Sequence, residues 1–386
     1  MGACGSKDIE AQRRKGGARD LSRWKAGDEA AEGGNEAASV ETNVVEVDFD
    51  PRSPVNLVLN TVATLSTSTT ECVTGWEDGS VRQIDWQSSR VVRTWQPHTR
   101  AVNRVVVGER HGKLYSSSRD TTIAVTTPVS AAETESASIK LQGHTLNVSA
   151  IAVDTDETSL CSGGRDTQTM FWDLTTAKIK SKNTTAQNVI TCSKWVPTEH
   201  VVLQGSEDLS VKLWDERSAL RTPVQTLRGY VYFPLCLDVS RDGLYFMTSS
   251  KGFNGVGAEV RVWDRRVGKQ LLQFEGHQQD ASACCFLPRG VLDSSEGEAP
   301  VPNASNGIPT PVSASKDGSI KVWNVNAENQ LLCEANEPSG RMFTSLASTG
   351  DDGTVLAATF NGDLHAYVYD TKQRSIGLSK SWHQRE

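Results

Sequence analysis

The sequence lacks any apolar run that approaches the roughly eighteen residues of a membrane-spanning helix, and its first residues hold no apolar signal core. It also lacks an excess of basic residues, because 40 Lys and Arg stand against 47 Asp and Glu, a net charge of −7. Nucleic acids attract strongly positive surfaces, so this balance argues against a nucleic-acid partner. We therefore expect an intracellular protein that neither spans a membrane nor binds nucleic acid.

Paired cysteines are missing as well. None of the eight cysteines forms a CxxC pair, and most stand in apolar, strand-like runs. The seven histidines are scattered, with no spacing typical of a metal cluster. We therefore expect buried thiols in a reducing compartment, no metal, no cofactor and no small-molecule substrate.

Tryptophan, in contrast, is over-used: ten Trp accompany nine Phe and six Tyr. Because Trp is usually the rarest aromatic residue, several of them must share a repeated structural role. In one register, an acid in a turn is followed six residues later by an aromatic residue. The clearest pairs are Asp166 with Trp172, Asp208 with Trp214, and Asp317 with Trp323.

The turn acids recur with a nearly constant period. From Asp78 to Asp120 is 42 residues, from there to Asp166 is 46, and from there to Asp208 is another 42. Such a period indicates a repeat architecture, in which each repeat is one small supersecondary unit. The gap from Trp263 to Trp323 is longer, at 60 residues. We explain it by an insertion at residues 289–312, which is rich in Pro, Ser, Gly and acids and which we expect to be disordered. Seven units result.

Each complete unit also carries a hydroxyl four residues before the acid and a histidine further upstream. A histidine lies 22 residues before Asp166 and a serine lies four residues before it. With the Trp indole, these side chains are predicted to form a buried hydrogen-bonded clamp within a β-hairpin. The complete set occurs twice, as His144, Ser162, Asp166 and Trp172, and as His277, Ser313, Asp317 and Trp323.

The clamp also has the residue types of a Ser-His-Asp hydrolase. We favour a structural role, because the set repeats along the chain and is tied each time to a Trp. The Gly-rich stretch 251–259 likewise opens no helix, so we interpret it as a rebuilt hairpin loop and not as a phosphate-binding loop. The sequence predicts no enzyme.

Three Trp-Asp dipeptides, at Trp172-Asp173, Trp214-Asp215 and Trp263-Asp264, make the chain resemble the WD-repeat family. The resemblance implies an all-β fold: a seven-bladed β-propeller over residues 44–386, preceded by a disordered tail at 1–43. We expect strand exchange between the two ends to close the ring. Residues 44–49 and 376–382 both have strand character, and the sequence does not choose between them.

A narrower resemblance lies in residues 188–264 and 284–289, which are similar to the WD repeat-containing protein 31 family. That resemblance implies a role at cilia, in support of intraflagellar transport or of cargo handling at the ciliary membrane. The opening Met-Gly-Ala-Cys-Gly-Ser-Lys separately resembles the dual-acylation signal of kinetoplastid flagellar calcium-binding proteins, although the sequence contains no EF-hand loop.

The first residues predict lipid attachment on chemical grounds too. Gly2 with Ser6 fits an N-myristoylation signal, and Cys4 lies where a palmitoyl thioester can form. Residues 7–25 hold seven basic and three acidic residues, a net charge of +4 that favours an anionic membrane leaflet. We expect the protein at the cytoplasmic face of a membrane, in a flagellum or cilium. The alternative is a chance motif on a disordered tail.

The predicted propeller offers one surface for partners, the face that carries the hairpin tips. The residue before each turn acid should lie there, and we single out Glu77, Arg119, Arg165, Glu207 and Lys316 as candidate partner-binding residues. The alternative is an ordinary solvated rim. The sequence thus predicts a non-enzymatic, lipid-anchored protein-interaction scaffold, with a soluble cytosolic adaptor subunit as the alternative and a propeller enzyme as a remote third.

Overall fold

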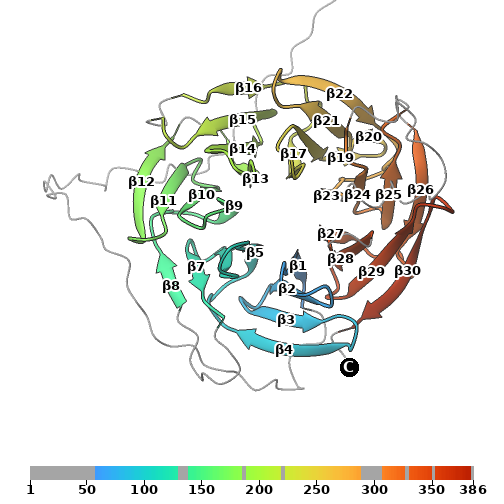
Figure 1. Ribbon diagram of the computed structural model, residues 1–386, viewed down its shortest axis with the longest axis horizontal. Helices are drawn as coiled ribbons and strands as arrows, with labels where there is room; N and C mark the ends of the chain where they lie inside the picture. Colours follow the sequence, from blue (N-terminus) through green and yellow to red (C-terminus); the bar gives the residue numbers. More distant parts are fainter. Residues whose placement is uncertain are drawn as a thin grey trace, which may run out of the picture. The chain divides into compact units, whose positions relative to one another are not determined.

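The computed structural model describes residues 57–128, 138–184, 188–218, 222–287, 307–326, 330–349 and 353–383. Within these ranges the chain forms seven four-stranded antiparallel sheets. Each sheet is built from strands that follow one another in sequence, except that an extra hairpin separates the second and third strands of the fifth sheet. The sheets follow one another around a ring as the blades of a propeller (Figure 1). The predicted all-β, seven-bladed propeller is confirmed.

Blades 1 to 4 account for the first half of the ring. Their strands are β1 (Leu59–Thr64), β2 (Glu71–Trp76), β3 (Val81–Asp85) and β4 (Arg90–Trp95); β5 (Val102–Val107), β6 (Leu114–Ser118), β7 (Ile123–Thr126) and β8 (Ser138–Leu141); β9 (Val148–Val153), β10 (Ser159–Gly164), β11 (Thr169–Asp173) and β12 (Lys178–Asn183); and β13 (Ile190–Trp195), β14 (Val201–Ser206), β15 (Ser210–Asp215) and β16 (Gln225–Leu227).

Blades 5 to 7 complete it. Their strands are β17 (Pro234–Val239), β18 (Tyr245–Ser250), β21 (Val260–Asp264) and β22 (Lys269–Phe274); β23 (Ala283–Phe286), β24 (Pro311–Ala314), β25 (Ser319–Trp323) and β26 (Leu331–Asn336); and β27 (Phe343–Ser348), β28 (Thr354–Thr359), β29 (Leu364–Asp370) and β30 (Ser375–Trp382). A small extra hairpin in blade 5 consists of β19 (Gly252–Phe253) and β20 (Val256–Gly257).

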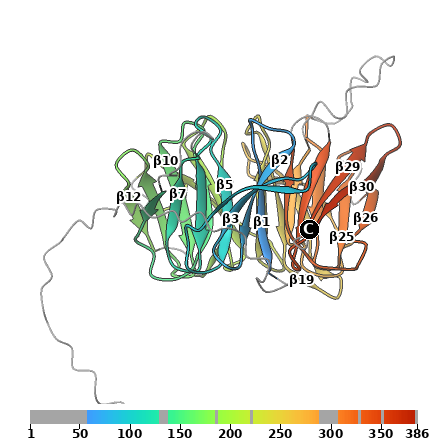
Figure 2. The same ribbon diagram turned by 90° about the horizontal axis from the view of Figure 1, so that it is seen from below.

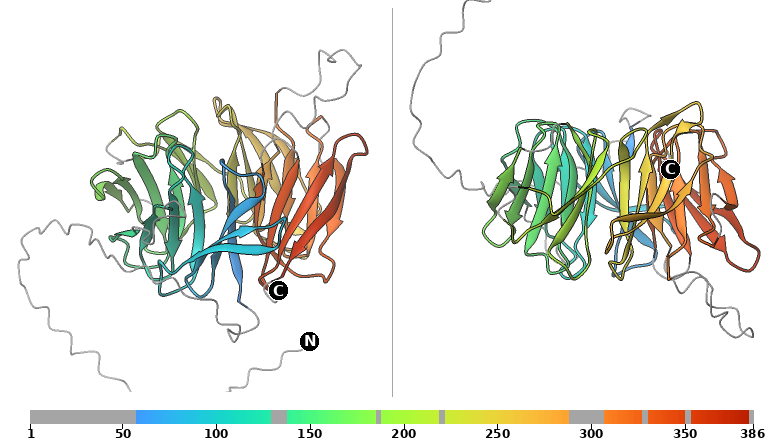
Figure 3. Two further views of the ribbon diagram at one scale, coloured as in Figure 1. Left: turned by 60° about the horizontal axis from the view of Figure 1, so that its bottom comes forward. Right: turned by 90° about the horizontal axis from the view of Figure 1, so that it is seen from above.

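The strands run along the ring axis, so their connections gather at two ends of the ring (Figures 2 and 3). The first strand of each blade lines the centre and the fourth lies outermost (Figure 1). Burial follows this order, because a blade is covered on both sides by its neighbours. Every residue of β10 is buried, whereas most of β12 on the outside is exposed.

Large aromatic side chains fill the spaces between blades. Phe171 of blade 3 packs edge-on against Trp195 of blade 4, with ring centroids 5.8 Å apart. Trp172 is buried in the core shared by blades 2 and 3. The predicted repeated role of tryptophan is therefore largely one of burial between and within blades.

A belt of side-chain hydrogen bonds also joins the inner strands. At one repeated position, an Asn, Ser or Thr donates to the backbone carbonyl that begins the inner strand of the next blade. This happens at six of the seven junctions, in the pairs Asn60 to Val102, Asn103 to Val148, Ser149 to Ile190, Thr191 to Pro234, Ser282 to Phe343, and Thr344 to Leu59. The belt therefore fixes the blades to each other around the centre.

The junction between blades 5 and 6 is the exception. The belt position there is Leu235, whose side chain has no donor. The two blades are joined instead through the extra hairpin, in which Gly255 N–H donates to Gln278 O (3.0 Å) and Phe253 pairs with Gln279. The rebuilt loop at 251–259 thus replaces a missing belt bond.

The expected strand exchange between the chain ends is wrong. The described strands of blade 7 are all C-terminal, with β30 as the outermost, and those of blade 1 are all N-terminal. Side chains close the ring: Thr344 Oγ1 donates to Leu59 O at 2.6 Å, and Trp76 meets Trp382 edge-on with ring centroids 5.9 Å apart. Packing suffices because this junction buries the same kind of apolar surface as the others.

The predicted insertion is shorter than expected at its C-terminal end. Pro311 and Val312 belong to β24, and Ile308 is buried in the core between blades 5 and 6. The Pro content was misleading, since Pro is compatible with the first residue of a strand. Residues 288–306, the tail with Gly2 and Cys4, and the expected strand at 44–49 lie outside the described residues.

Candidate functional site

The clamp in blade 3 forms a continuous chain of hydrogen bonds. His144 Nδ1 lies 2.9 Å from an Asp166 carboxylate oxygen, and His144 Nε2 lies 2.7 Å from Ser162 Oγ. Trp172 Nε1 donates to the same Ser162 oxygen at 2.8 Å. With Nδ1–H donated to Asp166, Nε2 of a neutral imidazole accepts the serine proton. Every polar atom of the set is therefore satisfied.

Two further blades hold versions of the clamp. In blade 6, His277 Nε2 lies 2.7 Å from Ser313 Oγ, which also accepts Trp323 Nε1 at 2.8 Å. Asp317 is slightly further away, with an oxygen 3.5 Å from His277 Nδ1, and Ser319 Oγ fills the gap at 3.0 Å. Blade 2 has the same bonds among His98, Ser116 and Asp120 without the indole.

Electrostatics explains why these acids stay charged. Burial raises the pKa of Asp166, but hydrogen bonds from His144 and from backbone N–H groups outweigh it, so the pKa is lowered overall. The same balance lowers the pKa of Asp317, again against burial. Burial also lowers the pKa of His277, which favours its neutral form.

The clamps are closed to substrates. Ser162 and Ser313 are fully buried, and each hydroxyl oxygen is already covered by an indole N–H. A nucleophile must reach its substrate's reacting atom, and these oxygens are fully buried within their own blades. The burial of both serine oxygens therefore favours a structural role for the Ser-His-Asp sets over hydrolysis.

Three of the four remaining blades, blades 1, 4 and 5, carry a cation in place of the histidine, which the sequence analysis did not predict. The residue two before the aromatic position of the third strand reaches back to an acid on the same blade. The pairs are Arg82 with Asp78, Lys212 with Asp208, and Arg261 with Glu259, and their cationic side chains are less than a tenth exposed. The signal was present in the sequence as a basic residue at a fixed offset from the aromatic position.

One end of the ring, which we call the hairpin face, carries the loops between the second and third strands and the loops that enter each blade. One backbone hydrogen bond recurs there in all seven blades at 2.8–3.0 Å, from a tip residue to its entering loop. It places seven side chains around the centre as a tip ring. The tip ring consists of Glu77, Arg119, Arg165, Glu207, Lys251, Lys316 and Phe360.

The hairpin face opens into a cavity of about 520 Å³ at the centre of the ring. Its wall combines belt amides such as Asn103 with the guanidinium of Arg104, and its mouth is lined by Phe233 and Met342. Arg104 Nη2 donates to Leu235 O at 3.2 Å, which leaves its other N–H groups for further acceptors. Polar groups that converge beside apolar ones are typical of a binding site.

The structure brings three of the five predicted partner-binding residues to this cavity. Arg165, Glu207 and Lys316 line it, whereas Glu77 and Arg119 lie on the tip ring without reaching its wall. Lys316 is held by Asp280 at 2.8 Å. The sequence reading missed Lys251 and Phe360 because neither is followed by a turn acid.

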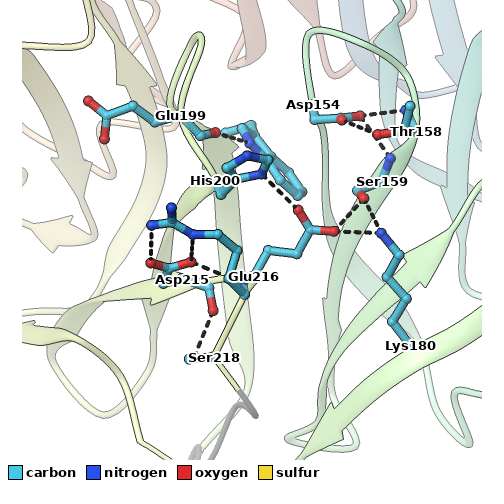
Figure 4. A network of polar contacts seen from close by, with 11 residues as sticks. Asp154, Thr158, Ser159, Lys180, Glu199, His200, Asp215, Glu216 and Ser218 are labelled. Atoms are coloured by element: carbon cyan, nitrogen blue, oxygen red, sulfur yellow. Dashed lines mark hydrogen bonds and ion pairs between the residues drawn. The ribbon is translucent and has the colours of Figure 1, made fainter.

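A polar network at the opposite end of the ring joins blades 3 and 4 (Figure 4). Glu216 accepts from Ser159 Oγ and from Lys180 Nζ, the latter at 2.7 Å, and its second oxygen lies 3.3 Å from His200 Nδ1. Burial opposes but does not outweigh the hydrogen bonds that lower the pKa of Glu216. All these groups satisfy each other, so this network holds two blades together and offers no site.

Metal and membrane features can be assessed for the same part of the chain. Among the described residues, no three His, Cys, Asp or Glu side chains are placed to hold a metal ion. Within the described ranges, no helix has the length and apolarity needed to cross a membrane.

Known proteins resemble parts of this chain. Residues 136–173, 179–215 and 268–324 match the WD40 family, described as "WD domain, G-beta repeat". Protein HIR1 of Cryptococcus neoformans var. neoformans serotype D is 26% identical over 239 residues, which cover 61% of this chain and 26% of HIR1. Nuclear distribution protein PAC1-1 of Uncinocarpus reesii is 25% identical over 302 residues, 59% of this chain and 65% of that protein.

A third relative is the small ribosomal subunit protein RACK1y of Oryza sativa subsp. japonica. It is 33% identical over 129 residues, 32% of this chain and 36% of RACK1y. The chain thus spans only about a quarter of HIR1 and less than two thirds of the other two. The similarity concerns the repeats, and it leaves large parts of each relative without a counterpart here.

Proposed function

The chain carries repeats of the WD40 family in a seven-bladed propeller, and we propose from this premise that it is a non-enzymatic scaffold for protein assembly. One observation carries the proposal: the hairpin face presents a ring of charged and apolar side chains around an open cavity, and six of these seven residues are exposed. The only Ser-His-Asp sets among the described residues are buried clamps. Partner proteins are the occupants that such a broad, mixed surface fits best.

The scaffold is further proposed to be lipid-anchored at a ciliary or flagellar membrane. Gly2, Cys4 and the basic residues of 7–25 support the anchor, because two acyl chains give stable attachment where one gives only reversible binding. The resemblance to the WD repeat-containing protein 31 family supports the ciliary site and a role in intraflagellar transport or membrane cargo handling. Protein partners at the cytoplasmic face follow from both.

The scaffold is tested by affinity purification of the full chain with a double change in the tip ring. Arg165→Glu with Phe360→Ser reverses one charge and removes one exposed apolar side chain at the mouth. We expect partners seen with the wild type to be lost, with the melting temperature unchanged. The matched control is Lys178→Glu with Val267→Ser, two exposed positions away from the hairpin face; equal partner sets for all three chains would contradict the proposal.

The anchor is tested separately, by intact mass and by imaging. Myristate and palmitate on native protein, together with loss of membrane localisation in Gly2→Ala and Cys4→Ser, are the expected results. An unmodified N-terminus with diffuse cytosolic signal would support the alternative, a soluble WD-repeat adaptor subunit. That outcome would leave the partner-binding face untouched, because its residues lie in the propeller.

A further inference from the structure

Among the described residues, blade 5 alone carries an extra hairpin, β19–β20, and this hairpin lies on the hairpin face. Its strand β19 is labelled near the bottom of Figure 2. The hairpin lies next to the loop that enters blade 5, because Gly257 of the hairpin contacts Tyr232 of that loop. Four apolar side chains are exposed here: Val231, Tyr232, Phe253 and Val256. We call these four residues the blade 5 platform. Phe253 is 66% exposed and Val256 is 57% exposed, which is unusual for side chains of this size.

The platform is held in place and is not a loose loop. Gly252 N–H donates to Asp280 Oδ1 at 3.0 Å, and Ala258 N–H donates to Lys251 O at 2.9 Å. Tyr232 packs directly over Gly257, where an added Cβ would lie 2.4 Å from the ring. Gly257 also has a φ of 73°, a conformation that favours glycine. The backbone therefore keeps these apolar groups in solvent at a fixed position.

The charges beside the platform are mostly positive. Arg228 and Lys251 are exposed, and Lys251 Nζ lies 5.2 Å from the ring centre of Phe233. The neighbouring acids are already engaged, in the pairs Asp208 with Lys212, Glu259 with Arg261, and Asp280 with Lys316. The wall of the adjoining cavity holds a single acid among the described residues, Glu207, and it has no ion pair there. The same wall holds two arginines, Arg104 and Arg165. The surface thus favours negative charge.

The platform is continuous with the central cavity. Phe233 lines the cavity mouth and directly follows Tyr232, and Arg104 lies deeper in the same wall. The exposed apolar groups of the platform thus lead into a recess that contains Arg104. Such a surface suits a peptide segment that can insert one side chain into the recess. A lipid headgroup layer would contact only the raised hairpin, so the recess favours protein over membrane as the occupant.

Building on the proposed scaffold function, we propose that the blade 5 platform and the adjoining cavity mouth bind a partner-protein segment that combines aromatic or aliphatic side chains with acidic ones. The apolar side chains cover Tyr232, Phe253 and Val256, and the carboxylates face Arg228, Lys251 and Arg165. A basic segment would meet like charge here and is excluded by the same geometry.

The test is a selection of random dodecapeptides displayed on phage, performed with the full chain. The platform variant is Phe253→Ser with Val256→Ser, and the charge variant is Arg228→Glu with Lys251→Glu. The matched control, Val267→Ser with Lys269→Glu, changes an exposed apolar and an exposed basic residue of the same blade at the other end of β21. Melting temperatures equal to the wild type show that each variant folds.

We expect peptides enriched in Asp or Glu and in aromatic or aliphatic residues. Their affinity should fall by about tenfold or more in the platform and charge variants and stay unchanged in the control. Selected peptides rich in Lys or Arg, or peptides that bind all variants equally, would overturn the inference. If peptide binding is lost only in the Arg165→Glu, Phe360→Ser variant, the scaffold function stands but the platform is not the binding site. If the selection yields no peptide at all, both proposals are contradicted.

The same variants also test two other possible occupants of the platform, a membrane and a second copy of the chain. Sedimentation with vesicles of phosphatidylserine and phosphatidylcholine, performed with unacylated protein, should not distinguish the wild type from the platform variant. A difference there would assign the platform to a membrane and overturn the inference. Self-association in analytical ultracentrifugation that disappears in the platform variant would overturn it too, because the occupant would be a second copy.

Discussion

The role of the clamp residues depends on their surroundings. Ser162, His144 and Asp166 have the bonding order of a catalytic triad, yet the serine oxygen accepts an indole N–H and has no contact with solvent. Hydrogen bonds inside a low-dielectric interior are strong, and an unpaired polar group there is costly. We therefore expect the loss of any one clamp residue to destabilise its blade.

Removal of the clamp acid should destabilise the propeller. Asp166→Ala leaves His144 Nδ1–H and Thr145 N–H without their acceptor. We expect the free energy of unfolding to fall by about 2–4 kcal/mol, measured by chemical denaturation. Asp156→Ala is the control, because that carboxylate is 71% exposed and pairs only with an exposed Arg110; equal losses in the two variants would contradict a clamp role.

The blade 6 clamp should make the propeller sensitive to mild acid. Burial lowers the pKa of His277, with Asp317 offsetting this only in part, so the unfolded chain binds the proton more readily than the folded one. The neutral histidine's contribution is thus complete above the unfolded value of about 6.5 and is lost as the pH falls toward the lower folded value.

His277→Gln tests this dependence. The variant should melt at a lower temperature than the wild type near neutral pH, and the difference should narrow toward about pH 5, because glutamine has no proton to gain there. Thermal unfolding across that range measures it. His200→Gln, at a mostly exposed histidine, should keep the wild-type profile; a parallel shift for His277→Gln would disprove the linkage.

At the scale of strands and loops, the belt and the extra hairpin both join neighbouring blades, at different junctions. Six junctions use a side-chain donor on the inner strand, and the seventh, where Leu235 replaces the donor, uses the hairpin bonds to residues 278–280. The hairpin is thus both a structural link between blades 5 and 6 and the support of the exposed platform. A change in this loop can affect stability and binding together, which is why the platform variants alter only exposed side chains.

The belt bond that closes the ring should be measurable by itself. Thr344→Val keeps the shape of the side chain but removes the hydroxyl that donates to Leu59 O. We expect a loss of about 1–2 kcal/mol in the free energy of unfolding, since the carbonyl loses its partner. Thr99→Val, at an exposed threonine of the hairpin face, is the control; no difference between the two would mean that the belt adds nothing to stability.

For the whole molecule, closure by packing makes the junction of blades 7 and 1 the place where the ring can open. Trp382, near the end of the described chain, is 4% exposed and contributes to the core that includes Trp76 and Leu356. No strand described here crosses this junction. The two ends therefore depend on apolar contact and on the belt for their attachment.

Trp382→Ala should consequently lower the free energy of unfolding by more than most truncations of a core side chain within one blade. We expect about 3–5 kcal/mol, together with increased proteolysis at the C-terminal strand β30. Val368→Ala, on the exposed side of the neighbouring strand β29, should change stability by less than about 0.5 kcal/mol. A Trp382 variant as stable as the Val368 variant would show that another contact closes the ring.

The repeats made much of this structure predictable. The nearly constant period of the turn acids predicted the number of blades. The spacing of Asp166 and Asp317 from their tryptophans predicted the two complete clamps, because hairpin geometry fixes which residues meet within a few positions of sequence. The same local rule placed Arg165 and Lys316 on the hairpin face. Lys251 and Phe360 escaped it, since their turns lack the acid that marked the others.

Only the tertiary structure decided what happens between blades. Ring closure by Trp76 and Trp382, the belt, and the joining of platform and cavity all bring together residues that are far apart in the sequence. No short-range pattern encodes such contacts, because they depend on how seven twisted sheets share the space around one axis. The sequence by itself determined the blade, and the packing of blades determined the ring and the surface that it offers to partners.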